Sequence, residues 1–150
     1  MSAELASEVE SARAGSGTRF IVLVGRILFA AIFILAAPGH FQAGTVAYAA
    51  SAGVPLPNVA VPVAGIIALL GGLSIAFGFR ARIGAWLLVV FLVPVTLYMH
   101  RFWGVPDAMM AQMQQVNFMK NLSMLGAALL VAWFGAGPVS LDARRTAPHA

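Results

Sequence analysis

Residues 59–99 read VAVPVAGIIALLGGLSIAFGFRARIGAWLLVVFLVPVTLYM, and this stretch decides the fold. It holds two apolar runs, 59–79 and 83–99, separated by a short basic break. A helix needs about 20 mostly apolar residues to span a bilayer, because it rises about 1.5 Å per residue across a hydrocarbon core about 30 Å thick. Both runs meet this requirement. The break is a tight turn, so we expect the two helices to be antiparallel neighbours.

Two further apolar runs flank this pair, and the composition agrees with four spans. The chain of 150 residues is 61% hydrophobic and 9% charged, whereas a soluble domain carries about 25% charged residues. We therefore predict an all-α fold, an integral membrane four-helix bundle with spans at about 20–37, 59–79, 83–99 and 116–135. The predicted organisation is a disordered cytoplasmic tail at 1–17, a transmembrane domain at 18–140 and a cytoplasmic tail at 141–150.

The distribution of basic residues predicts the orientation. With four spans, both tails and the turn at 78–82 share one side of the membrane. That side carries most of the arginines, namely Arg13, Arg19, Arg80, Arg82, Arg144 and Arg145. The other side carries Arg101, with Lys120 just inside the fourth span. Cytoplasmic loops are enriched in basic residues, so both termini are predicted to be cytoplasmic. The net charge of +4 is then explained by the orientation of the spans in the membrane, so it does not indicate a nucleic acid partner, and none is expected.

Small residues and a proline shape the expected packing of the bundle. Lipid gives helices no hydrophobic drive to associate, so close packing needs small side chains. Spacing four in the second span predicts such a seam along Ala64, Ala68, Gly72 and Ala76, with Gly65 and Gly71 beside it. Pro94 removes a helical hydrogen bond in the third span, and a bend there would open a cavity or have no role. Asp107 follows a proline and is expected to cap a helix that runs into the fourth span.

The absence of cysteine limits the chemistry of this chain. It excludes disulfide exchange, iron–sulfur clusters and thiolate zinc sites within the chain. His40 and His100 end the first and third spans at the same expected depth. Two such imidazoles can ligate a haem or a metal, but interfacial histidines are also common and no third ligand is evident. No metal site is therefore predicted.

Arg26 lies about 10 Å deeper in the first span than Arg19, at a rise of about 1.5 Å per residue. One interpretation is that its side chain snorkels to the cytoplasmic surface. The other is that it faces inward and holds an anion, a lipid headgroup or a polarised carbonyl. The inward interpretation is favoured because none of the four predicted spans contains Asp or Glu. Arg26 therefore has no acidic partner within the predicted spans.

A polar stripe begins the fourth span, formed by Gln114, Asn117, Lys120 and Asn121. These residues recur three and four apart and so share one helical face. An interfacial helix end with a snorkelling lysine is one interpretation. We favour a polar site that faces the bundle, because amides in hydrocarbon need partners. Trp103, beyond His100, is either an interface anchor or a cover over a flat aromatic ligand. We expect the two histidines, Asn117 and Lys120 to point into the bundle beneath Trp103.

Several segments together resemble the DoxX family. They are LVGRILFAAIFILAAPGHF, AGVPLP, GGLSIAFGFRARIGAWLL, HRFW, NFMKNLSMLGAALL and GPVSLD, in order from about Leu23 to Asp142. The resemblance implies a four-helix bacterial inner-membrane protein. It also implies a link to quinol-dependent or oxidative-stress redox systems, often beside a separate catalytic partner. The resemblance assigns no catalytic residue to this sequence.

These observations lead to one functional prediction with two alternatives. The prediction is a subunit or accessory of a quinone-linked or oxidative-stress redox system, with quinone as its possible ligand and without a redox centre of its own. It would work with a membrane or peripheral redox protein, and enzymatic activity and homo-oligomerisation are left open. The alternatives are a non-catalytic membrane scaffold or assembly factor, and a small-solute or lipid-handling protein. Candidate ligand-binding residues are His40, His100, Trp103, Asn117, Lys120, Asn121 and Arg26.

Overall fold

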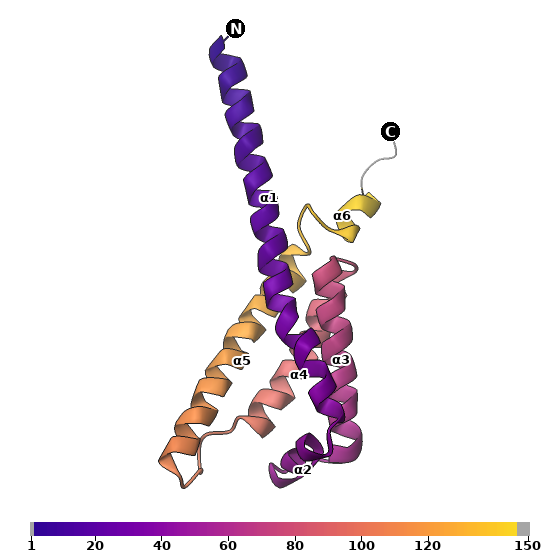
Figure 1. Cartoon of the computed structure of the whole chain (residues 1–150), viewed down its shortest axis with the longest axis vertical. Coiled ribbons are helices and arrows are strands. Elements are labelled where there is room, and N and C mark those ends of the chain that lie inside the picture. Colours follow the sequence, from indigo (N-terminus) through magenta and orange to yellow (C-terminus); the bar gives the residue numbers. More distant parts are fainter. Residues whose placement is uncertain (1, 147–150) are drawn as a thin grey trace.

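The structure is a computed structural model that describes the backbone of residues 2–146 and the side chains of residues 17 and 19–145. Every regular element in this part of the chain is helical (Figure 1). The elements are α1 (Ser2–Ala36), the short 3-10 helix η1 (Ala37–Phe41), α2 (Ala43–Ser51), α3 (Pro57–Phe77), α4 (Ala81–Met99), α5 (Ala108–Phe134) and α6 (Leu141–Thr146). The predicted all-α class is therefore confirmed.

Four helical segments are long and apolar enough to cross a membrane, as predicted. They are Arg19–Phe41, Pro57–Phe77, Ala81–Met99 and Ala108–Phe134. The fourth begins at Ala108 rather than Val116, because Asp107 caps it. The Asp107 carboxylate accepts a hydrogen bond of 2.7 Å from the main-chain N–H of Met110, which confirms the expected cap.

The four long helices pack side by side in the order α1, α3, α4, α5. The packed pairs are α1 with α3, α3 with α4 and α4 with α5, while η1 and α2 pack on α3. Figure 1 shows α5 diverging from α1 and α3 toward the end of the bundle that carries α2. This end is called the loop end below. The bundle is therefore widest at the loop end.

The small residues of α3 form the predicted seam. A Cβ atom built on Gly72 would lie 3.2 Å from Cβ of Phe33 and 3.3 Å from the carbonyl oxygen of Ala30, both on α1. One built on Gly71 would lie 2.7 Å from Cδ2 of Leu88 on α4. Glycines thus let α3 approach two neighbours at once, which is how helices pack in lipid.

Residues after α5 fold back onto the end of the bundle opposite the loops. The Asp142 carboxylate accepts hydrogen bonds from the N–H groups of Arg80 at 2.7 Å and Ala81 at 3.0 Å, and so caps α4. The N–H of Asp142 donates to the carbonyl of Gly78 at 2.8 Å. The start of the predicted tail at 141–150 is thus docked, whereas 147–150 lie outside the described residues. The backbone of residues 2–17 belongs to α1, and the disorder predicted for this tail stays a prediction.

Candidate functional site

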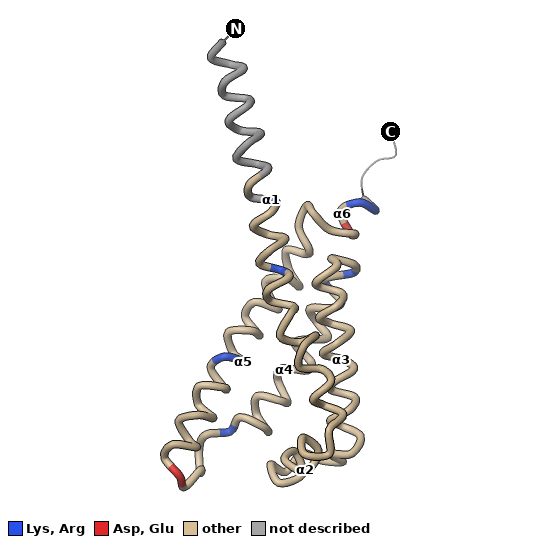
Figure 2. Tube along the Cα trace, viewed as in Figure 1, with Lys and Arg blue, Asp and Glu red and all other residues tan. Residues whose placement is uncertain are grey.

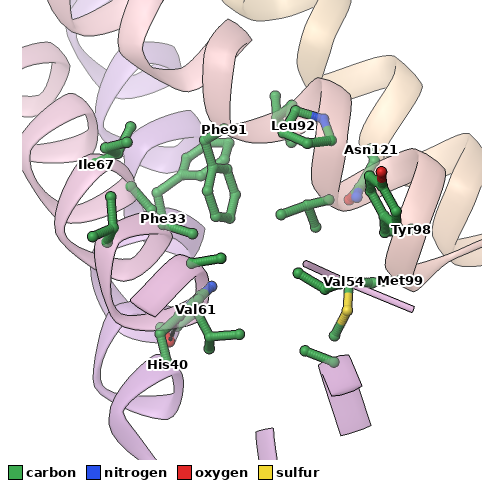
Figure 3. A pocket seen from close by; sticks show the side chains of 18 of the residues that line it. Phe33, His40, Val54, Val61, Ile67, Phe91, Leu92, Tyr98, Met99 and Asn121 are labelled. Atoms are coloured by element: carbon green, nitrogen blue, oxygen red, sulfur yellow. Dashed lines mark hydrogen bonds between the residues drawn. The ribbon is translucent and has the colours of Figure 1, made fainter. Parts of the chain in front are cut away.

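A cavity of about 530 Å³ lies at the loop end, bordered by α1, η1, α2, α3, α4 and α5. Its walls are mostly apolar, and the view in Figure 3 looks into it past Phe33, Ile67, Phe91 and Leu92. Small-molecule sites in proteins have volumes of about 300–1,000 Å³ and combine apolar walls with a few polar groups. This cavity has that character. Three of the predicted site residues line it: His40, His100 and Asn121.

Gly65 is the residue that brings His40 to the cavity. A Cβ atom at position 65 would lie 2.5 Å from Cβ of His40 and 3.4 Å from the carbonyl oxygen of Ala37. Only glycine therefore lets η1 approach α3 this closely. The His40 ring then packs edge-on to Phe91, with ring centroids 5.6 Å apart. Phe91 in turn packs edge-on to Phe33 at 6.1 Å, which completes an aromatic wall.

The hydrogen bond of His40 defines the role of its second nitrogen. Nδ1 lies 3.2 Å from the carbonyl oxygen of Ala36. A carbonyl oxygen only accepts, so Nδ1 carries the proton. In the neutral ring, Nε2 is then an acceptor. Among the described residues no donor reaches it.

A chain of hydrogen bonds shows in the same way which ring nitrogen of His100 carries the proton. The Tyr48 hydroxyl donates to the carbonyl of Met99 at 3.2 Å and accepts from Nε2 of Gln114 at 2.7 Å. Oε1 of Gln114 therefore faces His100 and accepts from its Nδ1 at 3.0 Å. Nε2 of a neutral His100 is again an acceptor. Both histidines that line the cavity thus have Nδ1 engaged with the protein.

Asn121 is a buried residue whose amide has no protein partner. Only 8% of the residue is exposed, and its side chain forms no hydrogen bond with any described residue. Thr96 is equally buried, but its hydroxyl donates to the carbonyl of Leu92 at 2.6 Å. Among the described residues, the fully buried side-chain polar atom that lacks a hydrogen-bond partner is Nε of Arg26, so the Asn121 amide keeps some accessible surface. The Asn121 amide borders the cavity across from His40 (Figure 3), so a ligand there can satisfy it.

Four predicted site residues lie outside the cavity, and three of them are Lys120, Asn117 and Trp103. Lys120 is exposed, so the expectation that it points into the bundle is not met. Asn117 is half-buried but is not part of the cavity lining. Trp103 packs against Phe102 and Phe118, with ring centroids 5.3 Å and 5.9 Å away, instead of covering the cavity. The reason is that α5 packs mainly on α4 and diverges from α1 and α3 toward the loop end, so few of its residues are buried.

Arg26 lies far from the other candidates, on the side of the bundle where α6 docks. It is 6% exposed, and its guanidinium donates to the carbonyls of Ala136, of Val139 at 2.9 Å and of Ala76 at 3.4 Å. Asp142 adds an electrostatic attraction. Arg26 therefore neither snorkels to the surface nor faces the cavity. The carbonyls at the end of α3 and after α5 accept its hydrogen bonds. Helix C-termini carry a partial negative charge, which stabilises a cation there.

Sequence reasoning missed Tyr48. It lies on α2, and nothing in the sequence indicated that its hydroxyl would reach Gln114 on α5. Gln114 was predicted, as the first residue of the polar stripe.

Within the described residues, no group of three or more His, Asp or Glu side chains is placed to hold a metal ion.

Comparison with known proteins agrees with this architecture. The DoxX family model matches residues 21–101. The chain is 34% identical over 133 residues to the inner membrane protein YphA of Escherichia coli (strain K12), which covers 87% of this chain and 94% of YphA. It is 36% identical over 123 residues to the inner membrane protein YqjF of the same organism, covering 81% of this chain and 88% of YqjF. No solved structure matches. This four-span membrane protein belongs to the DoxX family.

Proposed function

We propose that this DoxX-family membrane protein binds the ring of a quinone or quinol in the cavity, as a subunit or accessory of a quinone-linked redox system. The observation that carries the proposal is the unpartnered Asn121 amide in a cavity whose other walls are apolar and aromatic. A quinone ring is flat and apolar, with an oxygen at each end. It needs aromatic packing and a few hydrogen-bonding groups, which is what Phe33, Phe91 and Asn121 offer.

The hydrogen-bond roles favour the reduced ring. His40 and His100, when neutral, both offer Nε2 as an acceptor. A quinol has two hydroxyl donors, whereas a quinone has two carbonyl acceptors. The Asn121 amide can donate or accept and so suits either form. The protein is therefore expected to hold the quinol more tightly than the quinone, and electrons would pass to or from a separate partner protein.

A second candidate function is that of a membrane scaffold that docks another membrane protein. Lys120 favours it. This lysine is exposed and lies 12 residues after Ala108, about 18 Å along α5 at a rise of about 1.5 Å per residue. Charged residues inside spans normally face a partner or a polar cavity. A partner helix that carries a carboxylate would meet this need.

The proposed location is the bacterial inner membrane with both termini in the cytoplasm. The relatives are named inner membrane proteins. Arginines gather at the end of the bundle that carries α6, which the distribution of basic residues assigns to the cytoplasm. The cavity would then lie on the periplasmic side.

A native purification tests the proposed ligand. The protein is purified in mild detergent, and its bound lipids are extracted and analysed by mass spectrometry and absorption spectroscopy. We expect quinol or quinone to co-purify with the native chain and to be depleted from the Asn121→Leu variant. If neither protein carries any quinone, and added quinol does not bind, the proposed function is wrong.

A further inference from the structure

A second hollow, of about 500 Å³, lies at the opposite end of the bundle. It is bordered by the start of α4, the end of α5 and α6, and includes Arg80, Arg82 and Arg145. Figure 2 shows the basic residues at the turn between α3 and α4 and on α6. This hollow, called the arginine hollow below, has no part in the cavity described above.

The arginine hollow has an excess of unpaired positive charge. Among the described residues, the guanidiniums of Arg80, Arg82 and Arg145 form no hydrogen bond or ion pair. Those of Arg145 and Arg80 lie over the Phe79 ring, at 5.0 Å and 5.9 Å from its centroid. Asp142 is the one acid of the lining, and its carboxylate already accepts from the main-chain N–H groups that begin α4.

Apolar side chains adjoin these charges. Ile83 on α4 is 55% exposed and Phe134 on α5 is 73% exposed, and both line the hollow. They belong to the ends of two membrane spans, so their exposed surfaces lie where the bilayer begins. The site therefore offers cations at the headgroup level and apolar surface directly beside them.

Gly135 borders the hollow directly after α5. Its φ angle is +83°, which favours glycine, and a Cβ atom there would lie 3.4 Å from Nε of Arg82.

We propose that the arginine hollow binds the phosphate group of an anionic phospholipid, with the acyl chains against Ile83 and Phe134. Arginine is suited to phosphate because its planar fork donates two parallel hydrogen bonds. The neighbouring apolar surface selects a lipid over free phosphate. Basic pockets of this kind between spans are known to bind acidic lipid headgroups.

Native mass spectrometry tests this proposal. The full chain is reconstituted in equal amounts of phosphatidylglycerol and phosphatidylcholine, released, and scored for the lipid that it retains. We expect phosphatidylglycerol to be retained in preference. Each arginine near an anionic headgroup contributes a preference of about five-fold, so the double variant Arg82→Gln/Arg145→Gln should lower the preference about thirty-fold. Arg101→Gln, at the other end of the bundle, should leave it unchanged.

Other outcomes overturn the proposal. Equal retention of the two lipids by the native chain, or an equal loss in Arg101→Gln, would mean that the hollow does not select the headgroup. Displacement of phosphatidylglycerol by inorganic phosphate alone would identify a site for a soluble anion instead. If the double variant does not fold, Arg145→Gln alone changes one exposed side chain and should lower the preference about five-fold.

Discussion

The guanidinium of Arg26 donates a hydrogen bond of 2.9 Å to the main-chain carbonyl of Val139, 113 residues later in the chain. With the bonds to Ala136 and Ala76, it joins α1 to the end of α3 and to the segment after α5. An arginine within a membrane span is thereby stabilised by carbonyl dipoles. Its role is to hold the end of the bundle where α6 docks.

Replacement of Arg26 distinguishes this structural role from ligand binding. Arg26→Leu leaves one buried and two partly buried carbonyls without this donor and should lower the free energy of unfolding by about 3 kcal/mol. Arg26→Lys keeps the charge but cannot reach all the carbonyls, so its effect should be smaller. Unfolding in detergent measures both. A leucine variant of native stability that has lost quinol binding would show that Arg26 belongs to the ligand site.

Gly65→Ala tests how His40 is held at the cavity. The added methyl group would meet Cβ of His40 at 2.5 Å and push η1 away from α3. We expect quinol affinity to fall about ten-fold, which corresponds to the loss of one hydrogen bond at the ligand. Gly126→Ala is the matched control, because nothing lies within 4 Å of a Cβ atom there. Equal binding by the two variants would contradict the placement of His40.

Asp142→Ala tests the docking of the C-terminal segment. It removes a carboxylate that accepts from two N–H groups at the start of α4. Helix caps contribute about 1–2 kcal/mol, and this one also ties two distant segments together. The loss of stability should therefore exceed that of Asp107→Ala, which caps α5 through one N–H group. Thermal unfolding compares the two, and a larger effect at Asp107 would contradict the docked arrangement.

Orientation is tested with a single introduced cysteine. The chain has no cysteine of its own, so Ser51→Cys in the exposed end of α2 is a unique label site. A membrane-impermeant thiol reagent applied from the periplasmic side should label it. A reporter that is active only after export should stay inactive when fused after Ala150. Labelling of residue 51 only after the membrane is broken would reverse the topology.

The sequence predicted the four spans because apolar length and loop charge are local properties. It also placed His40 and His100 at one level, since both end a span, and both line the cavity. Asn117, which was predicted to join them, does not line it. The sequence misjudged Lys120, because its orientation depends on how far α5 diverges from α1, which no residue of α5 reveals. It also missed the partners of Arg26. These are main-chain carbonyls, which every residue has, so sequence cannot single them out.

Asn121 and Asn117 lie one helical turn apart on α5, and only Asn121 lines the cavity. Replacing each by leucine and titrating the purified protein with a reduced short-chain quinone tests the account most directly. Asn121→Leu should weaken quinol binding about ten-fold or more, while Asn117→Leu should bind as the native chain does. Equal affinities in all three proteins, or a loss confined to Asn117→Leu, would contradict the assignment of the cavity as the ligand site.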